Sequence, residues 1–230
     1  LKELEADDLL LAIEKSLQKR RIGGEVVRLE VEETIPVEIL NLLIDGISIS
    51  KDYIYFSKSL LSLDDLNLLT KINREDLKEN LSIGKTHKFL KDINNTTNTK
   101  NRSIFNLIKK ESILLHHPYD LFTSSIEEFI NKAADDPLVK AIKITLYRVS
   151  KDSPIIEALI RAAENGKEVM TLVELKARFD EDNNIQWAKQ LEQAGIHVVY
   201  GIIGFKTHTK ICLVIRKEKG RLRNYFHIGT

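Results

Sequence analysis

The segment Lys206–Lys210, with the sequence KTHTK, places one histidine between two lysines. In an extended chain the side chains alternate, so Lys206, His208 and Lys210 would project on the same side. The two ammonium groups favour a neutral imidazole that can attack phosphorus, and they can hold phosphate oxygens while charge moves. A single H-x-K pattern is nevertheless common by chance, and a strand histidine beside surface lysines is more often structural. KTHTK by itself is therefore only a weak indication of phosphoryl transfer.

Two arginines have a spacing that supports this interpretation. Arg148, Arg178 and His208 are each separated by 30 residues, the length of one strand-helix-strand unit. Such a spacing would bring all three to the same rim of a sheet. Guanidinium groups around an imidazole suit the oxygens of a phosphate.

The second half of the chain has the pattern of elements that this arrangement requires. The sequence predicts strands at 141–147, 168–175 and 196–200, helices at 124–134, 154–165 and 183–194, and a closing hairpin at 211–228. Ser124 and Ser125, each three residues before a glutamate, predict a capping box for the first of these helices. The fold class is α/β, a mainly parallel sheet with helices on both faces. In such sheets, ligands bind beyond the carboxyl ends of the strands.

The first half of the chain predicts a separate, smaller domain. Residues 1–91 contain two short predicted strands and several helices, which is typical of a small α+β domain, and they show no reactive constellation. Residues 92–103, DINNTTNTKNRS, are too polar to bury a core and predict a linker. Residues 104–230 then form the second domain.

Composition excludes several classes of protein. The chain has 230 residues with a net charge of +1 and 43% hydrophobic residues, which excludes a disordered chain, and no apolar run is long enough to cross a membrane. The single cysteine, Cys212, excludes an internal disulfide framework. The neutral total hides a local excess, because residues 206–230 carry seven basic side chains against Glu218 alone. We expect this cationic segment to surround His208.

Other polar motifs have equally good structural interpretations. Asp180–Asp182 resemble a metal cluster, but they directly precede a helix, where carboxylates cap and complement the helix dipole. His197 begins an apolar strand and fits a packed core residue. His116–Asp120, HHPYD, is compatible with a turn before the capped helix. The scattered aromatic residues, Trp187 among them, form no platform on which bases could stack.

Taken together, seven motifs resemble polyphosphate kinases of the first family. They are HHPYD at 116–120, TLYR at 145–148, DSPII at 152–156, LVELKARFDE at 172–181, GIHVVYG at 195–201, KTHTK at 206–210 and HIGT at 227–230. The resemblance is dense over residues 104–230, and residues 1–90 are similar to the family's head domain more loosely. It implies a phospholipase D-like fold for the second domain.

The resemblance also implies an activity and roles for single residues. The family transfers the terminal phosphate of ATP reversibly to inorganic polyphosphate through a phosphohistidine, which corresponds to His208, with Lys210 beside it. Arg148 and Arg178 match residues that the family assigns to magnesium binding. Because arginine has no lone pair for a metal, we expect both to hold phosphate next to Mg²⁺, together with Lys206. Ile215 stands where the phospholipase D signature H-x-K-x₄-D has its aspartate, which argues against phosphodiesterase chemistry.

Further expectations follow from this resemblance. The substrates would be ATP, ADP and polyphosphate, with no nucleic acid, in a homo-oligomer located in the cytoplasm or, alternatively, attached to the inner face of the membrane. Residues 1–230 would lack the family's N-terminal helical domain and second catalytic half, so we expect the fragment alone not to synthesise polyphosphate. Two alternatives are a non-catalytic module that binds polyanions and one half of a phospholipase D-like phosphodiesterase.

Overall fold

The computed structural model describes residues 13, 15, 23–80, 83–94, 103–149, 153–175, 177, 181–201 and 205–229. Contacts divide the chain into two compact units, of which the smaller comprises Lys15–Leu81 and the larger includes Ser82–Thr230. Residues 83–94 therefore group with the larger unit, whereas the sequence places the boundary at 92–103. Most of that expected linker lies outside the described residues. No helix among the described residues is long and apolar enough to span a membrane.

The smaller unit is built around a two-stranded parallel sheet. Its elements are β1 (Leu29–Glu32), α2 (Val37–Ile47), η2 (Lys51–Tyr53), β2 (Ile54–Ser57), η3 (Leu63–Lys71) and η4 (Glu75–Leu77). Strands β1 and β2 pair in parallel register, with Val31 opposite Phe56. Pro36 precedes the first turn of α2, where its missing N–H costs no hydrogen bond. The unit has mixed helices and strands, as the sequence predicts, although η3 is a 3₁₀ helix.

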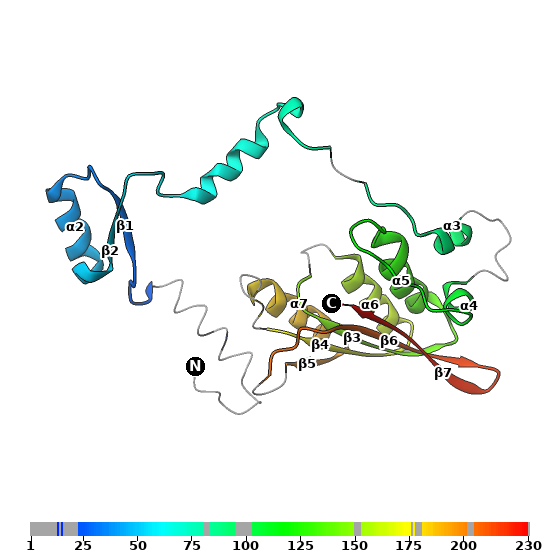
Figure 1. The fold of residues 1–230 in the computed structure, drawn as a ribbon. Coiled ribbons are helices and arrows are strands. Elements are labelled where there is room, and N and C mark those ends of the chain that lie inside the picture. Colours follow the sequence, from blue (N-terminus) through cyan, green and yellow to red (C-terminus); the bar gives the residue numbers. More distant parts are fainter. Residues whose placement is uncertain are drawn as a thin grey trace. The chain divides into compact units, whose positions relative to one another are not determined.

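The larger unit combines helices with a five-stranded sheet (Figure 1). Its helices are α3 (Lys88–Asn94), α4 (Ile104–Ile108), η5 (Thr123–Glu127), α5 (Glu128–Asp135), α6 (Pro154–Glu164) and α7 (Glu181–Gln193). Helix α6 begins as the sequence predicts, because the Ser153 hydroxyl accepts a hydrogen bond from the backbone N–H of Ile155 at 3.3 Å.

The sheet has the strand order β5-β4-β3-β6-β7. Strands β3 (Val139–Leu146), β4 (Glu168–Val173) and β5 (His197–Tyr200) are parallel, and the crossover helices α6 and α7 connect them. Strand β6 (Lys210–Glu218) runs antiparallel to both β3 and β7 (Arg221–Gly229). Among the described strands of this sheet, β6 thus opposes four that share one direction. The α/β class and the mainly parallel sheet are confirmed.

One face of the sheet carries the helices α5, α6 and α7 (Figure 1). Buried side chains such as Ile142 and Val214 point to this face, while the opposite face presents Phe226 and Ile228, each 64% exposed. Among the described residues, helices therefore cover one face, where the sequence predicts both. The strands alternate in burial, as strands do when only one face of their sheet is covered.

The helix predicted at 124–134 begins differently from the predicted capping box. Ser125 is buried within η5, a π-helical turn that continues into α5. Its hydroxyl donates to the carbonyl oxygens of Leu121 at 2.7 Å and Phe122 at 3.2 Å. The serine thus satisfies carbonyls of the preceding turn and does not cap the helix, so this detail of the prediction is wrong.

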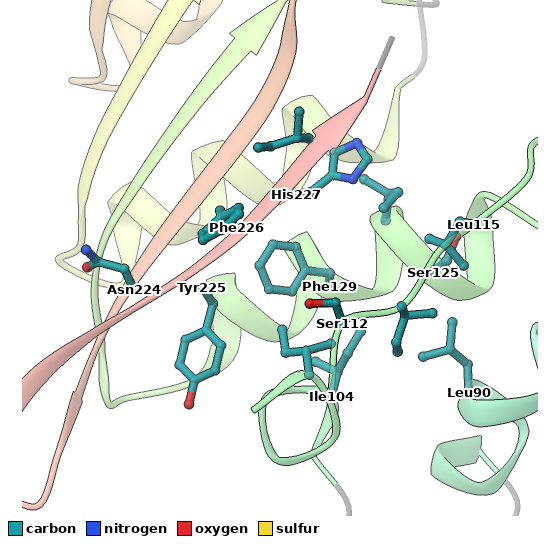
Figure 2. Close-up of a pocket in the computed structure, with 14 residues that line it drawn as sticks. Leu90, Ile104, Ser112, Leu115, Ser125, Phe129, Asn224, Tyr225, Phe226 and His227 are labelled. Carbon is teal, nitrogen blue, oxygen red and sulfur yellow. The ribbon is translucent and has the colours of Figure 1, made fainter. Parts of the chain in front are cut away.

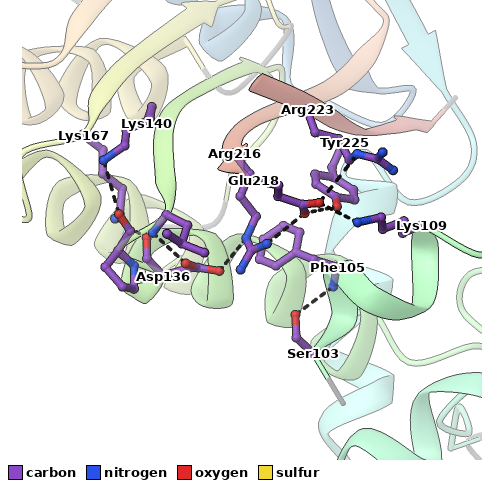
Figure 3. Close-up of polar contacts among 12 residues, drawn as sticks. Ser103, Phe105, Lys109, Asp136, Lys140, Lys167, Arg216, Glu218, Arg223 and Tyr225 are labelled. Atoms are coloured by element: carbon purple, nitrogen blue, oxygen red, sulfur yellow. Dashed lines mark hydrogen bonds and ion pairs between the residues drawn. The ribbon is translucent and has the colours of Figure 1, made fainter. Parts of the chain in front are cut away.

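A polar network fixes the end of the β6–β7 hairpin that lies near its turn (Figure 3). The Glu218 carboxylate accepts hydrogen bonds from Lys109 at 2.6 Å, Arg216 at 2.8 Å and the hydroxyl of Tyr225. Arg216 also donates to Asp136 at 2.9 Å. Hydrogen bonds from Lys109 and Tyr225, together with Arg216, lower the pKa of Glu218 to about 2. The network therefore joins the hairpin to the ends of α4 and α5.

Candidate functional site

A pocket of about 840 Å³ lies beyond the carboxyl end of β3, next to the first residue of β6. Arg148, His208 and Lys210 all line it. Three further histidines that the sequence left without a role line it as well, namely His116, His117 and His227. The position agrees with the rule that α/β sheets bind ligands beyond the carboxyl ends of their strands.

The ring of Tyr147 is the centre around which the charged side chains gather. Its centroid lies 4.9 Å from that of His208, in an edge-to-face arrangement. The ammonium nitrogens of Lys210 and Lys206 lie 4.8 and 5.7 Å from the centroid, and the guanidinium carbon of Arg148 lies 5.7 Å away. An aromatic face attracts cations, so Tyr147 holds the positive groups near the imidazole. The sequence contains Tyr147 only as part of TLYR and gives no sign of this role.

The contact between His208 and Lys210 restricts the state of the imidazole. Nζ of Lys210 lies 3.1 Å from Nε2 of His208 and donates a second hydrogen bond to the His208 carbonyl oxygen at 2.6 Å. An ammonium group has no acceptor, so Nε2 accepts the hydrogen bond and carries its lone pair. Nε2 of His208 therefore faces the ammonium group of Lys210 as a hydrogen-bond acceptor.

The structure brings together most of the residues that the sequence selects. Arg148, Lys206, His208 and Lys210 are all within reach of Tyr147. Arg178 lies outside the described residues, so its expected place on the same rim stays a prediction.

The loop that carries His208 is held on both sides. The backbone N–H of Thr207 donates to the Glu174 carboxylate at 2.7 Å. The Thr145 hydroxyl donates to the carbonyl oxygen of Thr209 at 2.6 Å and accepts the N–H of Ile211 at 2.9 Å. These contacts join the ends of β3 and β4 to the loop. Sequence reasoning missed them, because neither Thr145 nor Glu174 has a distinctive spacing.

The HHPYD segment forms one wall of the same pocket. Asp120 accepts the backbone N–H of His116 at 2.8 Å, and Nδ1 of His117 lies 2.7 Å from the Asp120 carbonyl oxygen. Because a carbonyl only accepts, Nδ1 carries the proton and Nε2 of neutral His117 is left as an acceptor. The segment is a turn, as one interpretation of the sequence holds, but it is also part of the pocket.

His227 on β7 lies partly buried beside these groups. Burial lowers its pKa, and the positive charge that His117 acquires on protonation lowers it further. His227 is therefore neutral near pH 7. Cys212, its partner in the β6–β7 register, is buried, and burial raises the pKa of its thiol to about 12. The thiol is thus unreactive as a nucleophile.

The cationic segment at 206–230 divides into two groups, in contrast to the single cluster expected around His208. Lys210 lines the pocket and Lys206 lies beside the ring of Tyr147, whereas Arg216 and Glu218 belong to the network at the other end of β6. The two ends of this nine-residue strand are about 27 Å apart. The tip of the hairpin is a tight turn at Lys219–Gly220, both with positive φ. The first group lies beside His208, and the second lies towards the other end of β6.

The described residues do not form a magnesium site of their own. No group of three or more His, Cys, Asp or Glu side chains among them is placed to hold a metal ion. The groups around His208 are cationic, and Arg148 cannot donate a lone pair. The arrangement fits phosphate oxygens and does not fit direct coordination of Mg²⁺.

A second pocket, of about 330 Å³, lies between β7 and the helices α3, α4 and α5 (Figure 2). Its wall is mostly apolar, with Ile104, Phe129 and Phe226 among its residues. His227 lines both pockets. This second pocket lacks the lysines and arginines of the first, which makes the first the better candidate for an anionic ligand.

Models of known protein families match both halves of the chain. Residues 103–230 match the model described as "Polyphosphate kinase C-terminal domain 1", and residues 1–69 match "Polyphosphate kinase middle domain". The first of these matches alone covers more than half of the chain.

Curated relatives and a solved structure agree with these matches. The whole chain is 58% identical to a polyphosphate kinase of Prochlorococcus marinus and 47% identical to one of Streptomyces coelicolor, of which it covers 33% and 30%. The chain thus spans about a third of the length of the curated relatives it matches. The crystal structure of a polyphosphate kinase from Porphyromonas gingivalis superimposes on 82% of this chain and 27% of that one, with a TM-score of 0.65 and 29% identity.

Proposed function

Because this chain belongs to the polyphosphate kinase family, we propose that it carries the phosphate-accepting histidine of an enzyme that moves phosphate between ATP and polyphosphate. The proposed nucleophile is His208. Its substrates are ATP and polyphosphate, with ADP as the other product, and the activity belongs to a longer protein of the relatives' size. Residues 1–230 alone, about a third of that length, are not expected to elongate a phosphate chain.

In the first step, Nε2 of neutral His208 attacks the terminal phosphorus of ATP. A nitrogen–phosphorus bond forms, the bond between that phosphorus and its bridging oxygen breaks, and ADP leaves with the electron pair. In the second step, a terminal oxygen of polyphosphate attacks the same phosphorus, and the nitrogen–phosphorus bond breaks. The neutral imidazole is regenerated, so no net proton transfer is required, and both steps are reversible.

The cations around Tyr147 stabilise the phosphoryl group as it is transferred. Lys210 lies against Nε2 of His208 before the reaction and can shift to an oxygen of the arriving phosphate. Arg148 and Lys206 lie near the same ring and can bind further oxygens. Fixed positive charge is most effective where negative charge develops in a transition state. Magnesium fits this scheme as part of the ATP substrate, bound to its phosphates, with Arg148 and Arg178 holding phosphate beside it.

The observation that carries the proposal is the hydrogen bond from Lys210 to Nε2 of His208 inside a cationic pocket. This contact places a nitrogen lone pair, which can attack phosphorus, beside hydrogen-bond donors that can bind phosphate oxygens. A module that only binds polyanions needs the cations and has no use for the lone pair.

The test compares His208→Gln with the wild-type full-length enzyme. We expect the variant to lose ATP-dependent polyphosphate synthesis by about 10³-fold or more while still binding polyphosphate, since the lysines and arginines remain. Polyphosphate binding should weaken steeply with salt in both proteins. If synthesis in His208→Gln stays within threefold of wild type, the histidine is not the nucleophile and the polyanion-binding alternative is favoured.

A further inference from the structure

We propose that Thr145 and Glu174 are positioning residues that fix the backbone on both sides of His208 for phosphoryl transfer. This inference rests on the proposed function of His208. It assigns neither residue a contact with substrate. Their effect is on the geometry of the nucleophile, and it follows from hydrogen bonds at Thr207 and Thr209, the two neighbours of His208.

Glu174 holds the residue before the nucleophile. It directly follows β4, its side chain is 3% exposed, and its carboxylate accepts the N–H of Thr207 at 2.7 Å. A backbone N–H bound by an ionised carboxylate makes one of the stronger hydrogen bonds in proteins. Because the carboxylate is buried and its own backbone N–H is bonded to β3 at Leu146, it provides a rigid point of attachment.

Thr145 holds the residues after the nucleophile. Its hydroxyl uses both its donor and an acceptor position, towards the Thr209 carbonyl at 2.6 Å and the Ile211 N–H at 2.9 Å. Thr145 is the second-last residue of β3, so this bond ties the loop to the central strand of the sheet. The two attachments therefore come from adjacent parallel strands and bracket a single residue.

The side chain of Asn184, on α7, connects the ends of strands β3 and β4. It is 2% exposed, and its amide donates to the carbonyl oxygens of Tyr147 at 2.8 Å and Glu174 at 2.9 Å. These are residues that follow β3 and β4. Asn184 thus connects the loop that carries Tyr147 and Arg148 to the carboxylate that holds Thr207.

The geometry explains why such attachments matter here. The side chain of His208 is exposed in the pocket and contacts Tyr147 and Lys210, so its direction depends on the backbone beneath it. Attack on phosphorus requires the nitrogen, the phosphorus and the leaving oxygen to lie in line, and small displacements cost large factors in rate. A misplacement of about 1 Å caused by a substitution away from the reacting atoms can cost about 10²-fold in rate.

The sharpest test is a matched pair of threonine substitutions in the full-length enzyme. Thr145→Val removes a hydroxyl with two hydrogen bonds to the loop. Thr171→Val makes the same change on the adjacent strand β4, at a 0% exposed residue whose hydroxyl has no hydrogen-bond partner among the described residues. Single-turnover phosphorylation by ATP is measured for both. We expect Thr145→Val to be 10- to 100-fold slower with the KM for ATP unchanged within threefold, and Thr171→Val to match wild type.

A graded series at Glu174 tests the other attachment. Glu174→Gln keeps an oxygen that can accept the Thr207 N–H, whereas Glu174→Ala removes it. We expect Glu174→Ala to lose 10- to 100-fold in the phosphorylation rate and Glu174→Gln to recover at least a fifth of the wild-type rate. Circular dichroism at the assay temperature confirms that each variant is folded. If a variant is unfolded, Glu174→Asp replaces it, and we expect its phosphorylation rate to lie between those of wild type and Glu174→Ala.

Two outcomes would contradict the inference, and each is distinct from failure of the proposed function. If wild type is phosphorylated at His208 and folded Thr145→Val and Glu174→Ala react within threefold of it, the attachments do not position the nucleophile. The inference is also overturned if Thr171→Val is slowed as much as Thr145→Val, because loss of packing would then explain both. If wild type carries no phosphate on His208, the proposed function itself fails.

Discussion

Nζ of Lys210 lies 3.1 Å from Nε2 of His208, on a side chain that also binds the His208 carbonyl oxygen. If His208 is the nucleophile that we propose, the lysine lies where phosphorus would have to approach Nε2. For the reaction to proceed, the ammonium group has to exchange the imidazole nitrogen for a phosphate oxygen. Under the proposed function, Lys210 therefore contacts the reacting nitrogen before the transfer and a phosphate oxygen during it.

Replacing Lys210 should consequently slow the first step strongly. Lys210→Met keeps the length of the side chain and removes the charge, and we expect phosphorylation by ATP to fall by about 10²- to 10³-fold in single-turnover assays, the loss typical of one transition-state donor. Lys217→Met is the matched control, because Lys217 is exposed near the far end of the same strand. Equal effects of the two substitutions would mean that Lys210 acts only through general positive charge.

The Glu218 network should stabilise the β6–β7 hairpin in a pH-dependent way. Because its hydrogen bonds lower the pKa of Glu218 to about 2, its contribution is present above the ordinary glutamate pKa and is lost as the pH falls from about 4.5 towards 2. We expect Glu218→Gln to lower the local free energy of unfolding at pH 7 by about 1–2 kcal/mol. Hydrogen exchange of peptides covering 210–229, at matched pH, measures this.

Comparing hydrogen exchange of wild type and Glu218→Gln at several pH values tests whether the charge of the Glu218 carboxylate is responsible. Wild type and Glu218→Gln should differ in exchange at pH 6–7 and should converge as the pH approaches 2 to 3. A difference that is the same at all pH values would show that the glutamine perturbs packing around Tyr225 and that the carboxylate charge is not the cause.

Gly84 should be intolerant of a side chain for steric reasons. A Cβ at this position would lie 2.4 Å from the carbonyl oxygen of Pro118, in the HHPYD turn, and 3.2 Å from Leu121. We expect Gly84→Ala to cost about 1–3 kcal/mol and to displace the wall of the pocket that carries His116 and His117.

Hydrogen exchange of peptides covering 113–122 and the KM for ATP measure these two effects. Gly46→Ala serves as the control, since a Cβ at Gly46 meets nothing within 4 Å and an alanine favours a helix. Unchanged exchange in 113–122 for Gly84→Ala would contradict the steric argument.

The pKa of His227 should respond to its neighbour His117. Burial and then the charge of His117 lower the pKa of His227, so neutral His227 predominates near pH 7 and protonation is shifted to more acidic pH. We expect His117→Gln to raise the pKa of His227 towards its ordinary value, as followed by NMR of ¹³C-labelled histidine. His116→Gln provides the control, because the His116 ring packs on Tyr119. A His227 titration that is identical in His117→Gln and wild type would exclude a charge effect.

Much of the larger unit was predictable from the sequence for simple physical reasons. The strands and helices from Val139 to Tyr200 alternate with clear stop signals, such as Ser153 before α6, and each lies within a few residues of its predicted range. Residues of the motifs could be assigned to one rim of the sheet because each follows a predicted strand, and parallel strands of one sheet end at the same edge. The same reasoning brought Arg148 and His208 together correctly.

The remaining features depend on contacts that have no local signal. The hydroxyl of Thr145 and the carboxylate of Glu174 act on backbone groups more than 30 residues away, so neither spacing nor residue type reveals them. The division of the basic segment into two groups results from the direction of β6, which carries Arg216 away from His208. A sequence pattern shows which residues share a face of the sheet. It does not show that basic residues close in the sequence lie at opposite ends of one strand.

Covalent phosphorylation of His208 during turnover can be tested directly. The full-length enzyme is incubated with ATP labelled at the terminal phosphate and digested at neutral pH, and the labelled peptide is sequenced by mass spectrometry. We expect an acid-labile, base-stable phosphate on the peptide containing KTHTK, located at His208 and discharged by added polyphosphate. Label found on another residue, or retained in His208→Gln, would contradict the account.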